Sequence, residues 1–193
     1  MVWKYDLLDY QKGWRVLRTP SRGFSLIELM VGLAVVAVLL VAAVPSFSTF
    51  IQNRKVRSAA EAVVYGLNIA KAEAVRRNTS VSIAVDAASG WTVGCASTST
   101  TCPGTIQQRD GADGTSNITT TAASFTFNGY GLVTSLSAGS STTIDVTNAL
   151  GTCEHVAATG KIRCLKIVVN SGGQVRMCDT KLTSTNPSSP QAC

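Results

Sequence analysis

The sequence predicts an α+β protein in which one long N-terminal helix packs on a domain of antiparallel strands. Three observations predict it: an apolar run at residues 24–44, a helical stripe of apolar residues at 56–74, and short alternating segments after Asn78. A long helix followed by many short strands is the order of an α+β fold. We expect a leader at 1–23, a transmembrane helix at 24–44, an amphipathic continuation of that helix at 45–78, and a β domain at 79–193 with a disulfide-closed C-terminal tail.

The apolar run holds 21 residues and one charged side chain, Glu28. At about 1.5 Å per residue, a helix of this length is roughly 31 Å long and matches the core of a bilayer. A carboxylate in a membrane helix costs about 2.5–3.5 kcal/mol near the bilayer centre and less toward an end, so Glu28 needs a compensating partner. The nearest candidate is a freed amine on Phe24. An ordinary single-span anchor is the alternative, but it leaves the Gly23–Phe24 junction unexplained.

The leader differs from a secretory signal peptide, because the cleavage-like Gly23 precedes the apolar run instead of following it. Processing at this point would therefore leave the membrane segment in the mature chain. The leader carries five basic and two acidic residues, a net +3, which places it in the cytoplasm by the positive-inside rule and the folded part in the periplasm. Removing it takes away half of the formal net charge of +6, so the high pI is poor evidence for a nucleic-acid partner.

Residues 22–29 read Arg-Gly-Phe-Ser-Leu-Ile-Glu-Leu and resemble the start of the type IV prepilin and pseudopilin family. The resemblance implies a type IV pilin-like fold and cleavage between Gly23 and Phe24 by a membrane prepilin peptidase, which also methylates the new Phe24 amine. It implies that Glu28 pairs with the amino terminus of a neighbouring subunit during assembly. The implied partners are other pilins or pseudopilins, the peptidase and the bacterial inner membrane, which the chain crosses once before it enters a pilus or pseudopilus.

Beyond the apolar run, Pro45 is expected to kink or loosen the helix, after which a helical pattern resumes. Apolar residues recur there at intervals of four and three, which predicts an amphipathic helix laid on the domain. The small residues in this stripe favour close packing against a sheet. The stripe consists of Val56, Ala60, Val63, Leu67, Ala70 and Ala74.

Strands are predicted where Thr, Ser and Val alternate in short runs bounded by turn residues. The 193 residues, less leader and span, leave about 150 for one core. The residues 97–101, 110–115 and 115–121 are expected to be solvated loops or surface turns. The predicted strands are 81–86, 91–93, 124–127, 142–146, 161–170 and 174–177, and the residues expected near the core are Ile162, Cys164, Ile167 and Val169.

All six cysteines follow the apolar run, and an even number on one side of a membrane indicates an oxidising compartment. Six cysteines allow 15 pairings, and near neighbours close the shortest loops. The pairing we expect is therefore Cys95–Cys102, Cys153–Cys164 and Cys178–Cys193.

Metal binding and catalysis find little support in the sequence. Cys153, His155 and Cys164 lack the spacing of a zinc site, and His155 is expected on the surface or in a turn. The sequence has no phosphate-binding loop, nucleophile elbow or zinc-protease motif, and its single histidine leaves a catalytic triad unsupported. We expect no enzymatic activity and no cofactor.

A Thr-rich β domain and a late segment, 168–178, resemble the GspH/FimT branch of minor pilins and pseudopilins. The resemblance implies a low-abundance subunit that helps to initiate or cap a type IV pilus or the pseudopilus of type II secretion. The Arg-Met-Cys at 176–178, followed by a cysteine-closed tail, favours the FimT/FimU side and hence the pilus.

Some FimT-like pilins bind DNA for natural transformation through a C-terminal Gly-Arg-x-Arg motif. Here the aligned residues, 173–176, read Gly-Gln-Val-Arg, so Gln174 replaces the first arginine. Residues 161–193 still carry a net +4 that could meet several phosphates, and a solvated basic rim is the alternative interpretation. The candidate DNA-binding residues are Lys161, Arg163, Lys166, Arg176 and Lys181.

Overall fold

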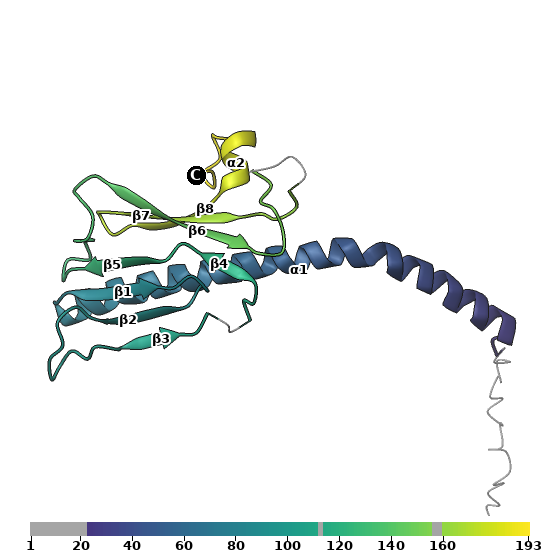
Figure 1. The fold of residues 1–193 in the computed structure, drawn as a ribbon, viewed down its shortest axis with the longest axis horizontal. Coiled ribbons are helices and arrows are strands. Elements are labelled where there is room, and N and C mark those ends of the chain that lie inside the picture. The colour runs from purple at the N-terminus through teal and green to yellow at the C-terminus, as the bar shows by residue number, and fades with distance from the viewer. Residues whose placement is uncertain (1–22, 112–113, 156–159) are drawn as a thin grey trace, which may run out of the picture. The chain divides into compact units, whose positions relative to one another are not determined.

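The computed structural model describes residues 23–111, 114–155 and 160–193 (Figure 1). Apart from Gly23, the predicted leader lies outside the described residues. The chain forms two compact units, Met1–Ala43 and Val44–Cys193. Helix α1, Leu26–Arg77, begins in the first unit and continues through Pro45 into the second.

The start of α1 is capped by Ser25. Its hydroxyl accepts the backbone N–H of Glu28 at 3.2 Å, and its carbonyl accepts that of Leu29 at 3.1 Å. A serine followed three residues later by a glutamate is the spacing of a capping box. By length and composition, no single described helix could cross a membrane, whereas the segments Leu26–Val41 and Ser46–Arg77 could do so taken together.

In the second unit, the predicted stripe of α1 is the face that is buried. All six of its residues, from Val56 to Ala74, are fully buried, as predicted. The helix ends where Asn78 adopts a left-handed conformation (φ 48°) and Thr79 donates its N–H to the carbonyl of Ala74 at 3.1 Å. A short polar residue in this conformation is a common way to terminate a helix.

The strands form two antiparallel sheets of four strands each, and α1 runs alongside them in the second unit (Figure 1). The first sheet has the order β3-β2-β1-β5 and the second the order β4-β6-β7-β8. A short helix, α2 (Thr180–Thr185), follows β8. The strands are β1 (Val81–Val85), β2 (Trp91–Cys95), β3 (Gln107–Arg109), β4 (Ile118–Thr120), β5 (Ala123–Phe127), β6 (Ser141–Asn148), β7 (Leu165–Asn170) and β8 (Val175–Asp179).

The core consists of the helical stripe and the inward-facing residues of both sheets. Register brings Ile83 opposite Phe125 in the first sheet and Ile144 opposite Ile167 in the second. The four residues expected near the core, at 162, 164, 167 and 169, are all buried, which confirms that prediction.

The structure differs from the sequence prediction in the shortest elements. Strands β3 and β4 and helix α2 were not predicted, and β7 begins at Leu165 rather than at 161. The segments expected to be solvated at 110–121 bury Ile118 and Thr120. They also bury Thr115, whose hydroxyl donates to the carbonyl of Gly111. Three-residue strands carry too little alternation to be recognised from the sequence. Their position is fixed by pairing with neighbouring strands.

Candidate functional site

The residues expected to be processed lie just before α1, in the first unit. Gly23 has open space around it, and Phe24 is 81% exposed. Glu28 is exposed in the first turn of the helix. The Gly23–Phe24 bond therefore lies in a non-helical, exposed segment of the kind that a peptidase could bind.

Glu28 also has a local structural role. Its backbone N–H is held by Ser25, and a carboxylate in the first turn is favourable because the helix dipole is positive there. Sequence reasoning did not assign this role, although the Ser-x-x-Glu spacing carries its signal. Pairing of Glu28 with a neighbouring subunit stays a prediction.

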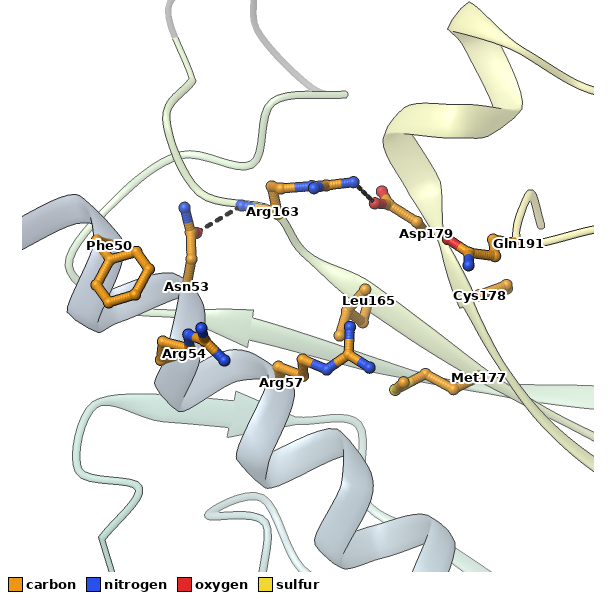
Figure 2. Close-up of a pocket in the computed structure, with 10 residues that line it drawn as sticks. All are labelled: Phe50, Asn53, Arg54, Arg57, Arg163, Leu165, Met177, Cys178, Asp179 and Gln191. Atoms are coloured by element: carbon orange, nitrogen blue, oxygen red, sulfur yellow. Dashed lines mark hydrogen bonds and ion pairs between the residues drawn. The ribbon is translucent and has the colours of Figure 1, made fainter. Parts of the chain in front are cut away.

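The second unit contains a groove of about 740 Å³ between α1 and the β7–β8 end of the second sheet. Figure 2 shows Arg57 reaching from the helix toward Leu165 and Met177, while Arg163 points along the strand ends toward Asp179. The groove therefore combines cationic walls with a partly apolar floor. Its lining residues are Phe50, Asn53, Arg54, Arg57, Arg163, Leu165, Met177, Cys178, Asp179 and Gln191.

The side chains of the groove are held by local and long-range contacts. The guanidinium of Arg54 lies 5.0 Å from the ring centroid of Phe50, and Nε of Arg57 lies 2.8 Å from Oε1 of Glu61 on the next turn. Arg163 forms an ion pair with Asp179. These contacts give the arginines defined positions along the groove.

Asn53 connects the helix to the chain that enters β7. Its Oδ1 accepts the backbone N–H of Arg163 at 2.9 Å, and its Nδ2 donates to the carbonyl of Lys161 at 3.4 Å. Sequence reasoning missed this residue, because its partners lie more than a hundred positions away and leave no local pattern. The result is a fixed corner between α1 and β7.

The candidate DNA-binding residues lie on more than one surface. Arg163 lines the groove, whereas Lys166 and Arg176 belong to the opposite face of the second sheet by strand alternation. Lys166 pairs with Asp145 at 3.4 Å, and Lys181 pairs with Glu154 at 2.6 Å.

Within the described ranges, Lys161 and Arg176 form no ion pair. Gln174 lies in the β7–β8 turn, where its side chain accepts from Asn170 at 3.1 Å. Its side-chain oxygen is therefore already used within the turn. DNA binding by these residues stays a prediction.

The three disulfides join the pairs expected from the shortest loops: Cys95 with Cys102, Cys153 with Cys164, and Cys178 with Cys193. The last one holds the C-terminal tail against β8, where the N–H of Asp179 donates to the carbonyl of Gln191 at 2.8 Å.

His155 is exposed and lies between the disulfide-bonded Cys153 and Cys164 in the sequence. Its Nδ1 lies 2.8 Å from the hydroxyl of Thr180. Among the residues that the structure describes, no three His, Cys, Asp or Glu side chains are grouped so as to hold a metal ion. The groove and the helix start are thus the two surfaces that call for a functional explanation.

A capped N-terminal helix with an apolar first segment, continued into a disulfide-bonded antiparallel β domain, defines a type IV pilin-like protein. Comparison with family models gives the same class. Residues 59–173 match the model described as type II transport protein GspH, and residues 18–44 match the prokaryotic N-terminal methylation motif. The first match covers more than half of the chain, so the chain belongs to the GspH family.

Solved structures similar to this one include the type IV minor pilin FimU of Pseudomonas aeruginosa in two crystal forms. The P21 form has a TM-score of 0.50 and 19% sequence identity, and the match covers 66% of this chain and 91% of FimU. The P65 form has a TM-score of 0.46 and 21% identity, and covers 63% and 90%. At this identity the first match shows a shared fold. The comparison with curated proteins gives no significant match.

Proposed function

We propose that this protein is a minor subunit of a type IV pilus, cleaved between Gly23 and Phe24, methylated on the Phe24 amine, and inserted into the filament through its N-terminal helix. The observation that carries the proposal is the Arg-Gly-Phe-Ser-Leu-Ile-Glu-Leu run at 22–29, within the matched methylation motif. The exposed Gly23–Phe24 bond, which lies before α1, supports access by a peptidase.

The apolar first segment of α1 supports an anchoring and assembly role. The large apolar side chains of this segment are exposed in the isolated subunit, including Leu26, Leu33 and Val38 at 78%, 62% and 71%. A continuous apolar surface of this kind needs lipid or neighbouring helices to cover it. We propose that it lies in the inner membrane before assembly and against other pilin helices afterwards.

Glu28 gives that assembly step its specificity. An ionised carboxylate in an apolar environment is costly unless a positive group meets it. The amine of Phe24 in an adjacent subunit is a suitable partner, because methylation leaves its positive charge in place. Pairing would therefore set the axial position of each new subunit relative to the last.

Isosteric neutralisation of Glu28 tests this role. We expect Glu28→Gln to reduce the protein in sheared filaments, because the ion pair is lost, while cleavage and methylation of Phe24 continue. Asp145→Asn removes a half-exposed carboxylate of the β domain and serves as the control. Immunoblots of filament and membrane fractions, with mass spectrometry of the N-terminal peptide, give the readout. Equal incorporation of Glu28→Gln and the control would contradict the proposal.

Membership of the GspH family also suits a pseudopilin of type II secretion, and the same mechanism would apply there. Deletion of the gene separates the two. Loss of surface pili with normal protein secretion supports the pilus, whereas normal pili with loss of secretion would replace that part of the proposal with the secretion pseudopilus.

A further inference from the structure

Strand β8 forms one edge of the second sheet, and its outward side can be identified from its hydrogen bonds. The carbonyl of Gln174 accepts the N–H of Asn170 on the β7 side, whereas the N–H of Asp179 donates to the tail on the other side. Backbone groups alternate between the two sides of a strand with a period of two. The N–H and C=O groups of Val175 and Met177 therefore point outward, in the same direction as those of Asp179.

The C-terminal tail covers only one end of this edge. Ala192 forms a parallel bridge with Asp179, and the Cys178–Cys193 disulfide holds the tail there. In the described part of the chain, no strand pairs with β8 on its outward side at residues 175–177. Exposed edges are normally protected, because they can pair with another chain. Here the tail shows that the edge accepts an added strand, and the cover stops before Met177.

The open edge adjoins the groove. Met177 lies opposite Ile167 in the register and shares its inward face, while Leu165 shares the face of Asp179. A strand added beside β8 would place every second side chain on this same face. Those side chains would meet the apolar floor at Met177 and the arginines that α1 presents above it (Figure 2).

The charges of the groove favour acidic side chains at these positions. Three arginines line it, and two of them have carboxylate partners, Arg57 with Glu61 and Arg163 with Asp179. Arg54 lies on the ring of Phe50 and, in the part of the chain that is described, forms no ion pair with a carboxylate. The groove therefore carries an excess of positive charge beside a strand edge.

A second copy of this chain does not supply the matching segment. The chain has 11 acidic residues against 17 basic ones, and no two acidic residues stand two positions apart. Alternate acidic residues are what the inward face of an added strand would need. The occupant must therefore come from a different protein.

We propose that the outward edge of β8 at residues 175–177 binds an extended segment of a partner protein that carries acidic residues at alternate positions. The backbone of the segment extends the second sheet, which supplies hydrogen bonds, and its acidic side chains pair with Arg54 and Arg57, which supplies selectivity. This binding surface lies outside the apolar first segment of α1 and goes beyond the proposed assembly role.

The test is fluorescence anisotropy with the full chain in detergent micelles and a short fluorescein-labelled peptide of alternating Glu and Val. A peptide of alternating Lys and Val is the probe control. We expect the Glu peptide to bind saturably and the Lys peptide not to bind. Equal binding of both peptides, or no binding of the Glu peptide, would overturn the proposal. Binding of labelled duplex DNA, with no binding of the Glu peptide, would also overturn the proposal and would identify the groove as a nucleic-acid surface instead.

Two pairs of variants separate strand addition from general charge attraction. Met177→Pro removes an outward N–H without removing a bond to β7, and proline is tolerated on such edges. We expect it to weaken binding about tenfold. Met177→Leu retains the N–H and should leave binding unchanged. Unchanged binding by Met177→Pro, with circular dichroism that shows a native fold, would overturn the proposal.

The second pair tests the arginines and does not depend on the proline variant. Arg57 and Arg76 are matched, since their side chains are 62% and 63% exposed and each pairs with a glutamate on α1. Arg57→Gln should weaken binding of the Glu peptide several-fold, whereas Arg76→Gln should leave that binding unchanged. Equal effects would mean that the net charge of the protein, rather than the groove, attracts the peptide.

Discussion

Gly66 of α1 packs directly against Trp91 of β2, which provides a test of the packing between the helix and the first sheet. A Cβ added to Gly66 would lie 2.7, 2.8 and 2.9 Å from three ring atoms of Trp91. Trp91 is only 2% exposed, and Tyr65 contacts its ring edge-on with centroids 6.3 Å apart. The ring therefore cannot move aside without disturbing its neighbours. We expect Gly66→Ala to destabilise the protein.

Two opposing effects set the change in the free energy of unfolding that Gly66→Ala causes. Replacing glycine by alanine inside a helix is worth about 0.8–1.0 kcal/mol in favour of folding. Overpacking a buried site costs about 1–3 kcal/mol, and all three contacts at Gly66 are far inside the usual van der Waals separation. The clash should prevail, for a net loss of about 1 kcal/mol in the free energy of unfolding.

A double-mutant cycle isolates the contact. In a Trp91→Leu background the clash disappears, so Gly66→Ala should stabilise by about 1 kcal/mol and the coupling energy should be about 2 kcal/mol. Urea unfolding of the full chain in detergent, followed by far-UV circular dichroism, measures each corner of the cycle. If Gly66→Ala stabilises the unmodified protein, or if the coupling energy is near zero, the proposed helix–strand contact is wrong.

Three further predictions concern the stability of the β domain. Replacing Cys178 and Cys193 together by serine should lower the free energy of unfolding by about 3 kcal/mol, because their disulfide closes a loop with a sequence separation of 15. A loss below about 1 kcal/mol in urea titrations would contradict this. Hydrogen bonds from Arg76 and Arg77, in the last turn of α1, lower the pKa of Glu73 below its ordinary 4.5. The stability that Glu73 contributes is therefore present above its unfolded-state pKa and is lost as the pH falls through its lower native pKa. Glu73→Gln should make the urea midpoint less sensitive to pH below about pH 4.5, and an unchanged dependence of the midpoint on pH would refute this. Gly139 (φ +77°) and Gly173 (φ +74°) have similar backbone conformations, but a Cβ at Gly173 would lie 1.9 Å from the carbonyl oxygen of Gly131, whereas a Cβ at Gly139 would meet no atom within 4 Å. Gly173→Ala should therefore lower the free energy of unfolding by at least about 2 kcal/mol and Gly139→Ala by about 1 kcal/mol. Equal shifts of the urea midpoint for the two variants would contradict this.

The features that the sequence predicted are those encoded by neighbouring residues. The spacing from Val56 to Ala74 places the whole stripe on one side of any α-helix, so its burial follows from periodicity alone. The short loops between cysteines likewise favour local pairs, and the structure has these pairs. The motif at 22–29 needs no fold to be recognised, and it carried most of the functional prediction.

The second unit shows what such local patterns leave open. Strand β3 reads Gln-Gln-Arg and has no apolar alternation, so only its pairing with β2 makes it a strand. The same is true of β4, whose three residues pair with β6. The burial of Thr120 depends on a hydrogen bond that its hydroxyl donates to the carbonyl of Asp86, 34 positions away.

The sequence by itself determined the class of this protein, the helical face that is buried and the cysteine pairs, because each depends on residues close together in the chain. Only the tertiary structure decided the groove and the open edge of β8. Arg57 and Met177 are 120 positions apart in the sequence, and the Asn53–Arg163 contact spans 110. Such pairs meet only when sheet order and register are fixed, and these depend on the packing of the whole domain rather than on any local pattern.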